Sequence, residues 1–304
     1  MKLDGTNVVV TGAASGIGLE LVRQLANSVQ FNVKAIWAVD VNANALATAF
    51  GEGRLVGTNI HKTTMVTPYV CDISKPENID KLFSEAQQLL GRIDVFIANA
   101  GFAYYERLET PDWERMEAIY KVNVQSPIYA FEKMQHMHST MEGQVRPHKT
   151  VMMASVMAHM GLPGYALYAS TKAALDRFAE THRAWEMKTP SELLLVYPIG
   201  TNQTNFCAAT TAPLAWPTQT PAQVASATIV GLQHDKTRVY PSWLFNAVLL
   251  LERICPCLHR LAFYLEYRKF CTWQREQPED AATVSSLSNT NTSSPKISEQ
   301  RKQQ

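Results

Sequence analysis

The stretch "VVVTGAASGIGLELVRQLA", Val8 to Ala26, decides the fold. A run of β-branched residues leads into three glycines, Gly12, Gly16 and Gly18, and then into apolar residues at helical spacing. Such glycines allow a tight turn, a close approach of the backbone to a pyrophosphate, and close packing of helix on strand. The start of the helix offers free N–H groups and the positive dipole end to phosphate. We expect a dinucleotide-binding turn here; a tight turn without a ligand is the alternative.

The rest of the chain continues this alternation of strand and helix. Short apolar runs such as "VKAIWAVDV", "IDVFIANAG" and "ELLLVYPIG" alternate with longer segments of helical periodicity such as "ENIDKLFSEAQQLLG". Uninterrupted Val, Ile and Leu runs are typical of strands buried on both faces. The pattern predicts an α/β fold with a doubly wound parallel sheet, right-handed crossovers and helices on both faces. Residues 113 to 137 are expected to form one long helix.

The composition excludes several classes of function. The 304 residues are 46% hydrophobic and 18% charged, with a net charge of +1, so nucleic-acid binding is disfavoured. The cysteines are odd in number and spaced neither for a zinc site nor for a disulfide framework, which favours a reducing compartment. The first residues have no signal-peptide pattern, and no run of 18 apolar residues exists, so we expect a cytoplasmic protein without a metal. The cysteines are Cys71, Cys207, Cys255, Cys257 and Cys271.

Two acidic residues follow predicted strands and are candidates for contact with a dinucleotide. Asp40 ends the second strand, 22 residues after Gly18, where an acid bonds the adenosine ribose hydroxyls. A carboxylate there repels a 2′-phosphate, and neither Ser15 nor Val41 is basic, so we predict NAD rather than NADP. A solvated carboxylate at a strand end is the alternative. Asp72, in "YVCDIS", closes the third strand and is placed to bond the adenine edge, although Asp is common at such turns.

The stretch "SVMAHMGLPGYALYASTKAAL", Ser155 to Leu175, carries the chemistry. Tyr168 and Lys172 are four residues apart and therefore share a helix face, at about 6 Å. A tyrosine with an ordinary pKa near 10 is a poor base at neutral pH unless a neighbour stabilises the phenolate, and a lysine ammonium does so. Ser155 would stabilise a substrate oxygen. A packed ring beside a snorkelling lysine is the alternative.

Together these motifs resemble those of the short-chain dehydrogenase/reductase family. The resemblance covers about residues 5 to 206 and rests on "TGAASGIG", "NAG" at Asn99 to Gly101, Asn123 in "KVNVQ", Ser155, and the Tyr168-x-x-x-Lys172 pair. It implies a single Rossmann-type domain of about seven parallel strands, a nicotinamide cofactor, and oxidoreduction of alcohols or carbonyls.

The resemblance also implies residue roles. Tyr168, Lys172, Ser155 and Asn123 would be catalytic, with Lys172 also holding the nicotinamide ribose and Asn123 anchoring a water that relays protons. In "YPIGTNQTNF", Ile199 separates the family's usual Pro-Gly pair, so the carboxamide contact passes to Thr204, with Thr201 as the alternate. The cofactor-binding set is Gly12, Ser15, Gly16, Ile17, Gly18, Asp40, Asp72, Ile73, Asn99, Ala100, Gly101, Tyr168, Lys172, Gly200 and Thr204.

Apolar residues near the catalytic stretch suggest a lipophilic alcohol or ketone as substrate. The substrate-contacting set is Ser155, Met157, Tyr165, Tyr168 and Phe206. Methionines are also common as core filler, which is the alternative. The leading function is an NAD-dependent alcohol dehydrogenase or ketone reductase, expected as a homodimer or homotetramer. The rivals are a non-catalytic dinucleotide-binding sensor or scaffold with the same fold, and a membrane-attached interaction protein.

The region after the catalytic domain divides in two. Residues 1–242 form the predicted NAD-binding catalytic domain, and 243–275 form an apolar extension in which two helices meet at Pro256. Packing on the domain or at an oligomer interface is the favoured interpretation of this extension. Peripheral membrane contact, with Cys255 and Cys257 as acylation sites, is the second. Residues 276–304 are rich in Ser, Thr, Asn and Gln and are predicted to be disordered.

Overall fold

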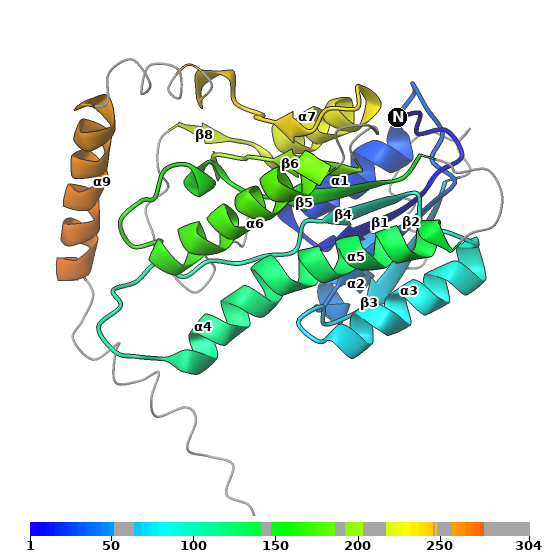
Figure 1. Cartoon of the computed structure of the whole chain (residues 1–304), viewed down its shortest axis with the longest axis horizontal. Coiled ribbons are helices and arrows are strands. Elements are labelled where there is room, and N and C mark those ends of the chain that lie inside the picture. The colour runs from blue at the N-terminus through cyan, green and yellow to red at the C-terminus, as the bar shows by residue number, and fades with distance from the viewer. Residues whose placement is uncertain are drawn as a thin grey trace, which may run out of the picture.

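A seven-stranded parallel sheet forms the centre of the molecule (Figure 1). The computed structural model describes residues 1–51, 64–140, 147–185, 192–202, 217–245, 247 and 257–276. The strand order is β3-β2-β1-β4-β5-β6-β9, which confirms the predicted doubly wound sheet. The strands are β1 Asn7–Thr11, β2 Ala35–Asp40, β3 Met65–Val70, β4 Val95–Ala98, β5 Lys149–Met153, β6 Leu193–Val196 and β9 Arg238–Val239.

Helices cover both faces of this sheet (Figure 1). In β1, Val8 and Val10 face a core cluster with α1, α2 and α7, while Val9 faces the cluster with α3 and α5 on the other side. Helix α6 packs beside α5 over β5 and β6. The helices are α1 Gly16–Asn27, α2 Ala43–Phe50, α3 Pro76–Leu90, α4 Trp113–Tyr120, α5 Ser126–Ser139, α6 Ala166–Trp185, α7 Pro221–Gln233 and α9 Cys257–Glu276.

The direction of strand addition reverses between β1 and β4. The chain builds β2 and β3 on one side of β1, and β4, β5, β6 and β9 on the other. In sheets of this kind a crevice opens at the carboxyl ends of the strands beside the reversal, and ligands bind there. The glycine turn after β1 and the segments after β4 and β5 therefore meet at this end.

Strand β3 differs from the prediction of strands buried on both faces. Met65 and Val70 are more than half exposed, because β3 is the edge strand and pairs only with β2. Pro68 lies within it, and proline in a sheet is tolerated at an edge. Apolar composition alone does not separate an edge strand from a central one.

The helix predicted over residues 113 to 137 is interrupted. Helix α4 ends at Tyr120, a π turn, η1, spans Lys121–Gln125, and α5 follows directly. The Ser126 N–H bonds to the Lys121 carbonyl, five residues back, which defines the wider turn. The turn carries Asn123, which is buried.

The C-terminal helix α9 begins directly after Pro256, where the sequence predicted a junction. The helix predicted before Pro256 lies for the most part outside the described residues. Glu276 is the last residue of α9, so the predicted tail does not begin at 276, and 277–304 lie outside the described part. Among the helices that are described, none is long and apolar enough to cross a membrane.

Candidate active site

The turn between β1 and α1 is closed by glycine. Gly12 has φ +66°, and a Cβ placed on it would lie 2.9 Å from the Ala100 Cα. A Cβ on Gly18 would lie 2.0 Å from the Gly12 carbonyl oxygen. Any larger side chain at either position would push α1 and the end of β4 away from the turn.

Asn99 ties the end of β4 to this turn. Its Nδ2 donates to the carbonyl oxygens of Thr11, at 2.9 Å, and Gly12, at 3.3 Å. The Thr11 hydroxyl in turn accepts from the N–H groups of Asn99 and Ala100, both at 3.1 Å. The segment that follows β4 is therefore held beside the glycine turn by side-chain hydrogen bonds.

The first turn of α1 keeps its N–H groups free of side-chain caps. The N-cap residue Ser15 makes no side-chain capping bond, and the turn contains no acidic residue. In contrast, α2 and α4 are capped by Asn42 and Asp112, whose side chains accept from Ala45 and Arg115. Uncapped N–H groups at a helix N-terminus suit an anionic ligand such as a pyrophosphate.

The two predicted acids lie at the same end of the sheet. Asp40 accepts hydrogen bonds from the backbone N–H groups of Ala14 and Asn42, each at 3.0 Å. Its carboxylate therefore faces the glycine turn. Asp72 accepts from the hydroxyl and N–H of Ser74, and the hydroxyl bond is the main reason that its pKa is lowered. Ile73 packs beside the core under α3.

Ser155, Tyr168 and Lys172 are buried at the carboxyl end of β5. Tyr168 lies in the first turn of α6, and the Lys172 Nζ, one turn further, is 5.5 Å from the centre of its ring. The Nζ donates to the carbonyl of Met153, the last residue of β5, at 2.7 Å. Burial lowers the pKa of Lys172 from 10.5 to about 7.

Ser155 follows β5 by two residues and caps a short 3-10 helix, η2 Val156–Ala158. Its Oγ accepts from the Met157 N–H at 3.1 Å and has a longer contact of 3.5 Å with the Pro198 carbonyl. The same carbonyl accepts from the Val156 N–H at 3.1 Å. The end of β6 therefore supports the serine segment.

Asn123 links the π turn to the segment after β4 and to α6. Its Nδ2 donates to the Phe102 carbonyl at 2.9 Å and contacts the Thr171 hydroxyl at 3.2 Å, while its Oδ1 accepts from the Phe102 N–H. A Cβ on Gly101 would lie 3.0 Å from that Oδ1 and 3.7 Å from the Lys172 Nζ. Asn123, Gly101 and Lys172 are thus neighbours in the structure.

A cluster of aromatic side chains lies beside Tyr168. Tyr168 contacts Tyr165, which contacts Tyr105, and Tyr105 contacts Phe270 and Trp273 of α9. Met157 packs against this cluster. The sequence favoured an apolar C-terminal region near the mouth of the site, but it did not indicate which residues of α9 would make the contacts.

Gly164 makes the approach of α9 possible. Its φ is +84°, and a Cβ on it would lie 2.4 Å from the Tyr105 ring and 2.8 Å from the Phe270 ring. The favoured prediction for the C-terminal extension was packing on the domain, and α9 makes such contacts. The membrane alternative remains a prediction.

The predicted residues in the segment after β6 are only partly described. Thr204 and Phe206 lie outside the described residues. Gly200 begins a two-residue strand, β7 Gly200–Thr201, which pairs with β8 Thr218–Gln219, and the alternate candidate Thr201 donates its hydroxyl to the Ile199 carbonyl. Among the described residues, no group of three or more His, Cys, Asp or Glu side chains could hold a metal ion.

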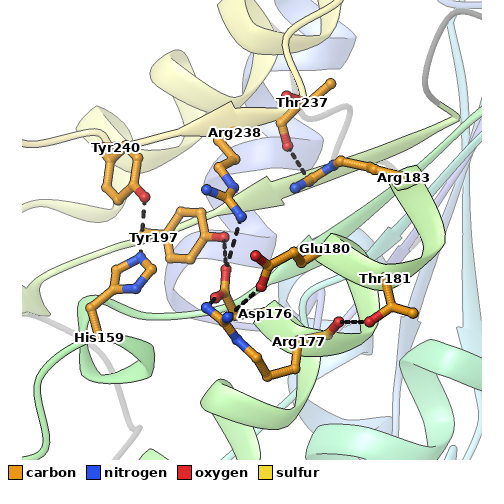
Figure 2. Close-up of polar contacts among 10 residues, drawn as sticks. All are labelled: His159, Asp176, Arg177, Glu180, Thr181, Arg183, Tyr197, Thr237, Arg238 and Tyr240. Atoms are coloured by element: carbon orange, nitrogen blue, oxygen red, sulfur yellow. Dashed lines mark hydrogen bonds and ion pairs between the residues drawn. The ribbon is translucent and has the colours of Figure 1, made fainter. Parts of the chain in front are cut away.

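A polar cluster behind the site was missed by the sequence analysis (Figure 2). Asp176 lies four residues after Lys172 on α6, is almost fully buried, and accepts from the Tyr197 hydroxyl at 2.5 Å. His159, four residues after Ser155, stacks on the Tyr197 ring. The available signal was an acid one turn after Lys172, in the largely apolar stretch "AALDRFA".

Comparison with families and with proteins of known sequence gives one consistent result. A family model described as short chain dehydrogenase matches residues 6–211. A hydroxynaphthalene reductase-like protein of Metarhizium majus is 30% identical over 182 residues, 59% of this chain and 62% of that protein. A hydroxynaphthalene reductase of Aspergillus fumigatus is 27% identical, over 59% of this chain and 60% of that protein. The matched part is less than two thirds of these relatives' length.

Solved structures share the fold. A short chain dehydrogenase/reductase of Burkholderia phymatum in complex with NAD has a TM-score of 0.68 at 20% identity, covering 85% of this chain and 96% of that chain. A short-chain dehydrogenase from Sphingobium yanoikuyae in complex with NADPH has a TM-score of 0.66 at 16% identity, covering 96% and 99%.

Proposed function

This chain belongs to the short chain dehydrogenase family of oxidoreductases, and from that premise we propose that it interconverts a secondary alcohol and a ketone with NAD. The observation that carries the proposal is the pair of buried side chains Tyr168 and Lys172, with the Nζ 5.5 Å from the ring centre. Alcohol oxidation needs a base for the hydroxyl proton, and ketone reduction needs the corresponding acid. The tyrosine hydroxyl is the group that meets this need.

Lys172 makes the tyrosine usable near neutral pH. Its pKa of about 7 means that the ammonium and amine forms coexist there. A phenolate on Tyr168 and an ammonium on Lys172 stabilise each other, because opposite charges attract strongly where water is excluded. Proton loss from the tyrosine is therefore coupled to proton uptake by the lysine.

Ser155 and Asn123 complete the proposed set of catalytic residues. The Ser155 hydroxyl would hold the substrate oxygen, as a fixed donor at a position where negative charge develops. Asn123, one hydrogen bond from Thr171 and adjacent to Gly101, would hold a water beside Lys172. Both roles come from the family resemblance.

The residues at the glycine turn fit a nicotinamide dinucleotide. The free N–H groups of the first turn of α1 suit its pyrophosphate, and Asp40 and Asp72 offer carboxylates to its adenosine half. Bound there, the dinucleotide would accept or supply the hydride. Gly101, Lys172 and, outside the described residues, Thr204 are proposed to hold the nicotinamide half.

Two observations support a lipophilic substrate that carries rings. The relatives named hydroxynaphthalene reductases act, by their names, on a fused aromatic compound. In this chain, Tyr165, Tyr105 and Met157 lie beside Tyr168, so the surroundings of the proposed acid are apolar and aromatic. A panel of ring-bearing and polyol alcohols would test this; faster turnover of the polyols would reject it.

Turnover in the Tyr168→Phe variant tests the function. We expect nicotinamide absorbance changes in the wild-type protein with secondary alcohols or ketones, and a loss of about 10²–10⁴-fold in kcat for Tyr168→Phe. Tyr120→Phe is the matched control, since it removes a hydroxyl that only contacts the Ser170 hydroxyl at 2.9 Å. Tight NADH binding without any turnover in the wild-type protein would instead favour the dinucleotide-binding sensor.

Asp40→Ala tests the preference for NAD. Removing the carboxylate that faces the glycine turn should shift the ratio of kcat/KM for NAD over NADP towards NADP by about tenfold or more, because repulsion of the 2′-phosphate is lost. Asp112→Ala is the control, since Asp112 also accepts a backbone N–H but caps α4. An unchanged ratio in Asp40→Ala would exclude Asp40 as the selecting residue.

We further propose that residues 1–242 form the catalytic domain, that 243–275 pack on it, and that the protein is a cytoplasmic homo-oligomer. The contacts of Phe270 and Trp273 with Tyr105 support the packing. Light scattering on the purified chain measures the assembly. Partitioning into anionic vesicles by the full chain, abolished in a variant truncated before residue 243, would favour the membrane alternative.

A further inference from the structure

Tyr197 lies between two parts of the proposed site. One is the segment after β5 that carries Ser155, and the other is α6, which carries Tyr168 and Lys172. Tyr197 follows β6, is fully buried, and is followed by Pro198, whose carbonyl contacts Ser155 Oγ and accepts the Val156 N–H. The backbone at this point therefore supports the serine segment directly.

The Tyr197 hydroxyl reaches the catalytic helix. It donates to Asp176 Oδ1 at 2.5 Å, and Asp176 is on α6 one turn after Lys172 and two turns after Tyr168 (Figure 2). Asp176 is 1% exposed. A single side chain thus connects the end of β6 to the helix that carries the proposed acid and its lysine.

The ring of Tyr197 contacts the segment that carries Ser155 through His159. The His159 imidazole stacks on it with 5.0 Å between ring centres, and Tyr240 stacks on it at 4.6 Å (Figure 2). The His159 Nε2 and the Tyr240 hydroxyl are 3.1 Å apart. The segment from Ser155 to His159 is therefore in contact with Pro198 at its first end and with the Tyr197 ring at its last.

This arrangement costs free energy that simple packing would not need. A buried carboxylate loses its hydration, and an apolar contact of the same size would hold β6 against α6 at least as firmly. Burial alone would raise the pKa of Asp176, but hydrogen bonds from Tyr197 and Arg177, together with the charges of Arg238 and His159, keep the pKa below its usual range. A directed bond to a charged acceptor fixes one geometry, which apolar packing does not.

We propose that Tyr197 is a positioning residue, which sets the distance between Ser155 and the Tyr168–Lys172 pair by bonding Asp176 and stacking on His159. This inference rests on the proposed function, because it assigns Tyr197 a part in that reaction. Tyr197 touches neither Tyr168 nor Lys172 in any of the contacts described above. It acts through the two segments that it joins.

The Tyr197→Phe variant tests the inference through a split between kcat and cofactor binding. Removing the hydroxyl should lower kcat about tenfold or more, because small misplacements of reacting groups reduce rates strongly, while the Kd for NADH stays within about twofold. Tyr129→Phe is the matched control. The Tyr129 hydroxyl also donates to a carboxylate, Asp80 Oδ1, at 2.8 Å, but this bond joins α5 to α3.

Two further variants separate positioning from folding. Asp176→Asn keeps an uncharged acceptor for the Tyr197 hydroxyl and should retain more of kcat than Asp176→Ala, which should match Tyr197→Phe. Glu180→Gln, the same acid-to-amide change one turn along α6, should leave kcat unchanged because Glu180 pairs at the surface with Arg177. If Tyr197→Phe fails to fold, His159→Ala provides the test of the positioning role. Because His159 is exposed, the variant should fold. It should lower kcat and leave the Kd for NADH unchanged.

The outcomes separate the inference from the function on which it rests. If the wild-type protein shows turnover and kcat is unchanged in both Tyr197→Phe and His159→Ala, the positioning role is overturned. The proposed function then stands. Equal losses of kcat and NADH affinity would also overturn it, since they indicate general disruption. Absence of turnover in the wild-type protein with either dinucleotide would overturn both proposals.

Discussion

Two buried lysines stand at opposite ends of strand β5. Lys149 is the first residue of the strand, and the Lys172 ammonium donates to the carbonyl of Met153, the last. Lys149 forms an ion pair with Asp235 Oδ1 at 2.7 Å. No carboxylate in the described part of the chain lies within ion-pair distance of Lys172, and burial lowers its pKa to about 7.

This difference in counter-charge indicates the role of each lysine. A charge that only stabilises the fold is buried together with its counter-charge, because an unpaired buried charge costs several kcal/mol. A lysine buried without one destabilises the unliganded protein and is retained where a ligand or a reaction uses its charge. Lys149 fits the first description, and Lys172 fits the second.

Lys172→Met should give the largest effect. We expect turnover to fall by about 10²–10⁴-fold, since the phenolate loses its stabilising charge. The free energy of unfolding at pH 7 should nevertheless rise by about 1–3 kcal/mol, because an apolar side chain replaces a poorly solvated amine. Turnover assays and denaturant unfolding of the same preparations measure both.

The pH dependence of stability sharpens this prediction. Between pH 7 and 10.5 the unfolded chain binds a proton at Lys172 that the folded chain does not, so wild-type stability rises with pH. The slope from this one residue reaches at most about 1.4 kcal/mol per pH unit. Lys172→Met lacks this contribution. The amount by which its free energy of unfolding exceeds that of the wild-type protein should therefore decrease as pH rises. Parallel curves for the two proteins would contradict the view that Lys172 is buried at a cost.

Lys149→Met should lower the free energy of unfolding, which Lys172→Met raises. Its overall effect is smaller because turnover is not affected. The variant loses a charge-assisted hydrogen bond to Asp235, and we expect the free energy of unfolding to fall by about 1–3 kcal/mol. Asp235 is 55% exposed in its side chain, so water solvates the remaining carboxylate and limits the loss. Turnover per folded molecule should stay unchanged. A stabilised Lys149→Met variant would remove the distinction between the two lysines.

Asp235→Asn should give the smallest effect, with a characteristic pH dependence. The hydrogen bond from Lys149 is the main cause that lowers the pKa of Asp235 below 3.8. Its contribution is therefore present above pH 3.8 and is lost as pH falls through the folded-state pKa. The Asn amide oxygen can still accept from the Lys149 ammonium, and water reaches this half-exposed site, so the difference from wild type stays at about 0.5–1 kcal/mol at pH 7 and shrinks as pH falls. Thermal melts at pH values from 2 to 7 would detect it.

The fold was largely predictable from local patterns. The run "ELLLVYPIG" is predicted as a buried strand, and it contains β6, Leu193–Val196, whose residues are all buried. The segment "ENIDKLFSEAQQLLG" is predicted as a helix, and it forms most of α3, Pro76–Leu90. Both depend on interactions within a few residues, which sequence spacing reports directly.

The parts that could not be predicted depend on contacts between distant residues. Nothing in the sequence places Tyr197 next to Asp176, 21 residues away, or Phe270 next to Gly164. The spacing of Tyr168 and Lys172 predicted their shared face, but it did not show that Lys172 would be buried and would bond to Met153. Burial, and with it the lowered pKa of Lys172, is a property of the assembled sheet and helices.

The π turn at Lys121–Gln125 constrains the length of the chain as well as its composition. Deleting one residue there would turn it into ordinary α-helix, with α4 and α5 at nearly the same relative rotation, because a π turn holds one extra residue within a single turn. Asn123 would lose the position from which it bonds the Phe102 carbonyl and the Thr171 hydroxyl, even if Asn123 itself were kept. In a library of variants, single-residue insertions and deletions within 121–125 should therefore be depleted as strongly as substitutions of Asn123, while substitutions of exposed residues on α4 survive.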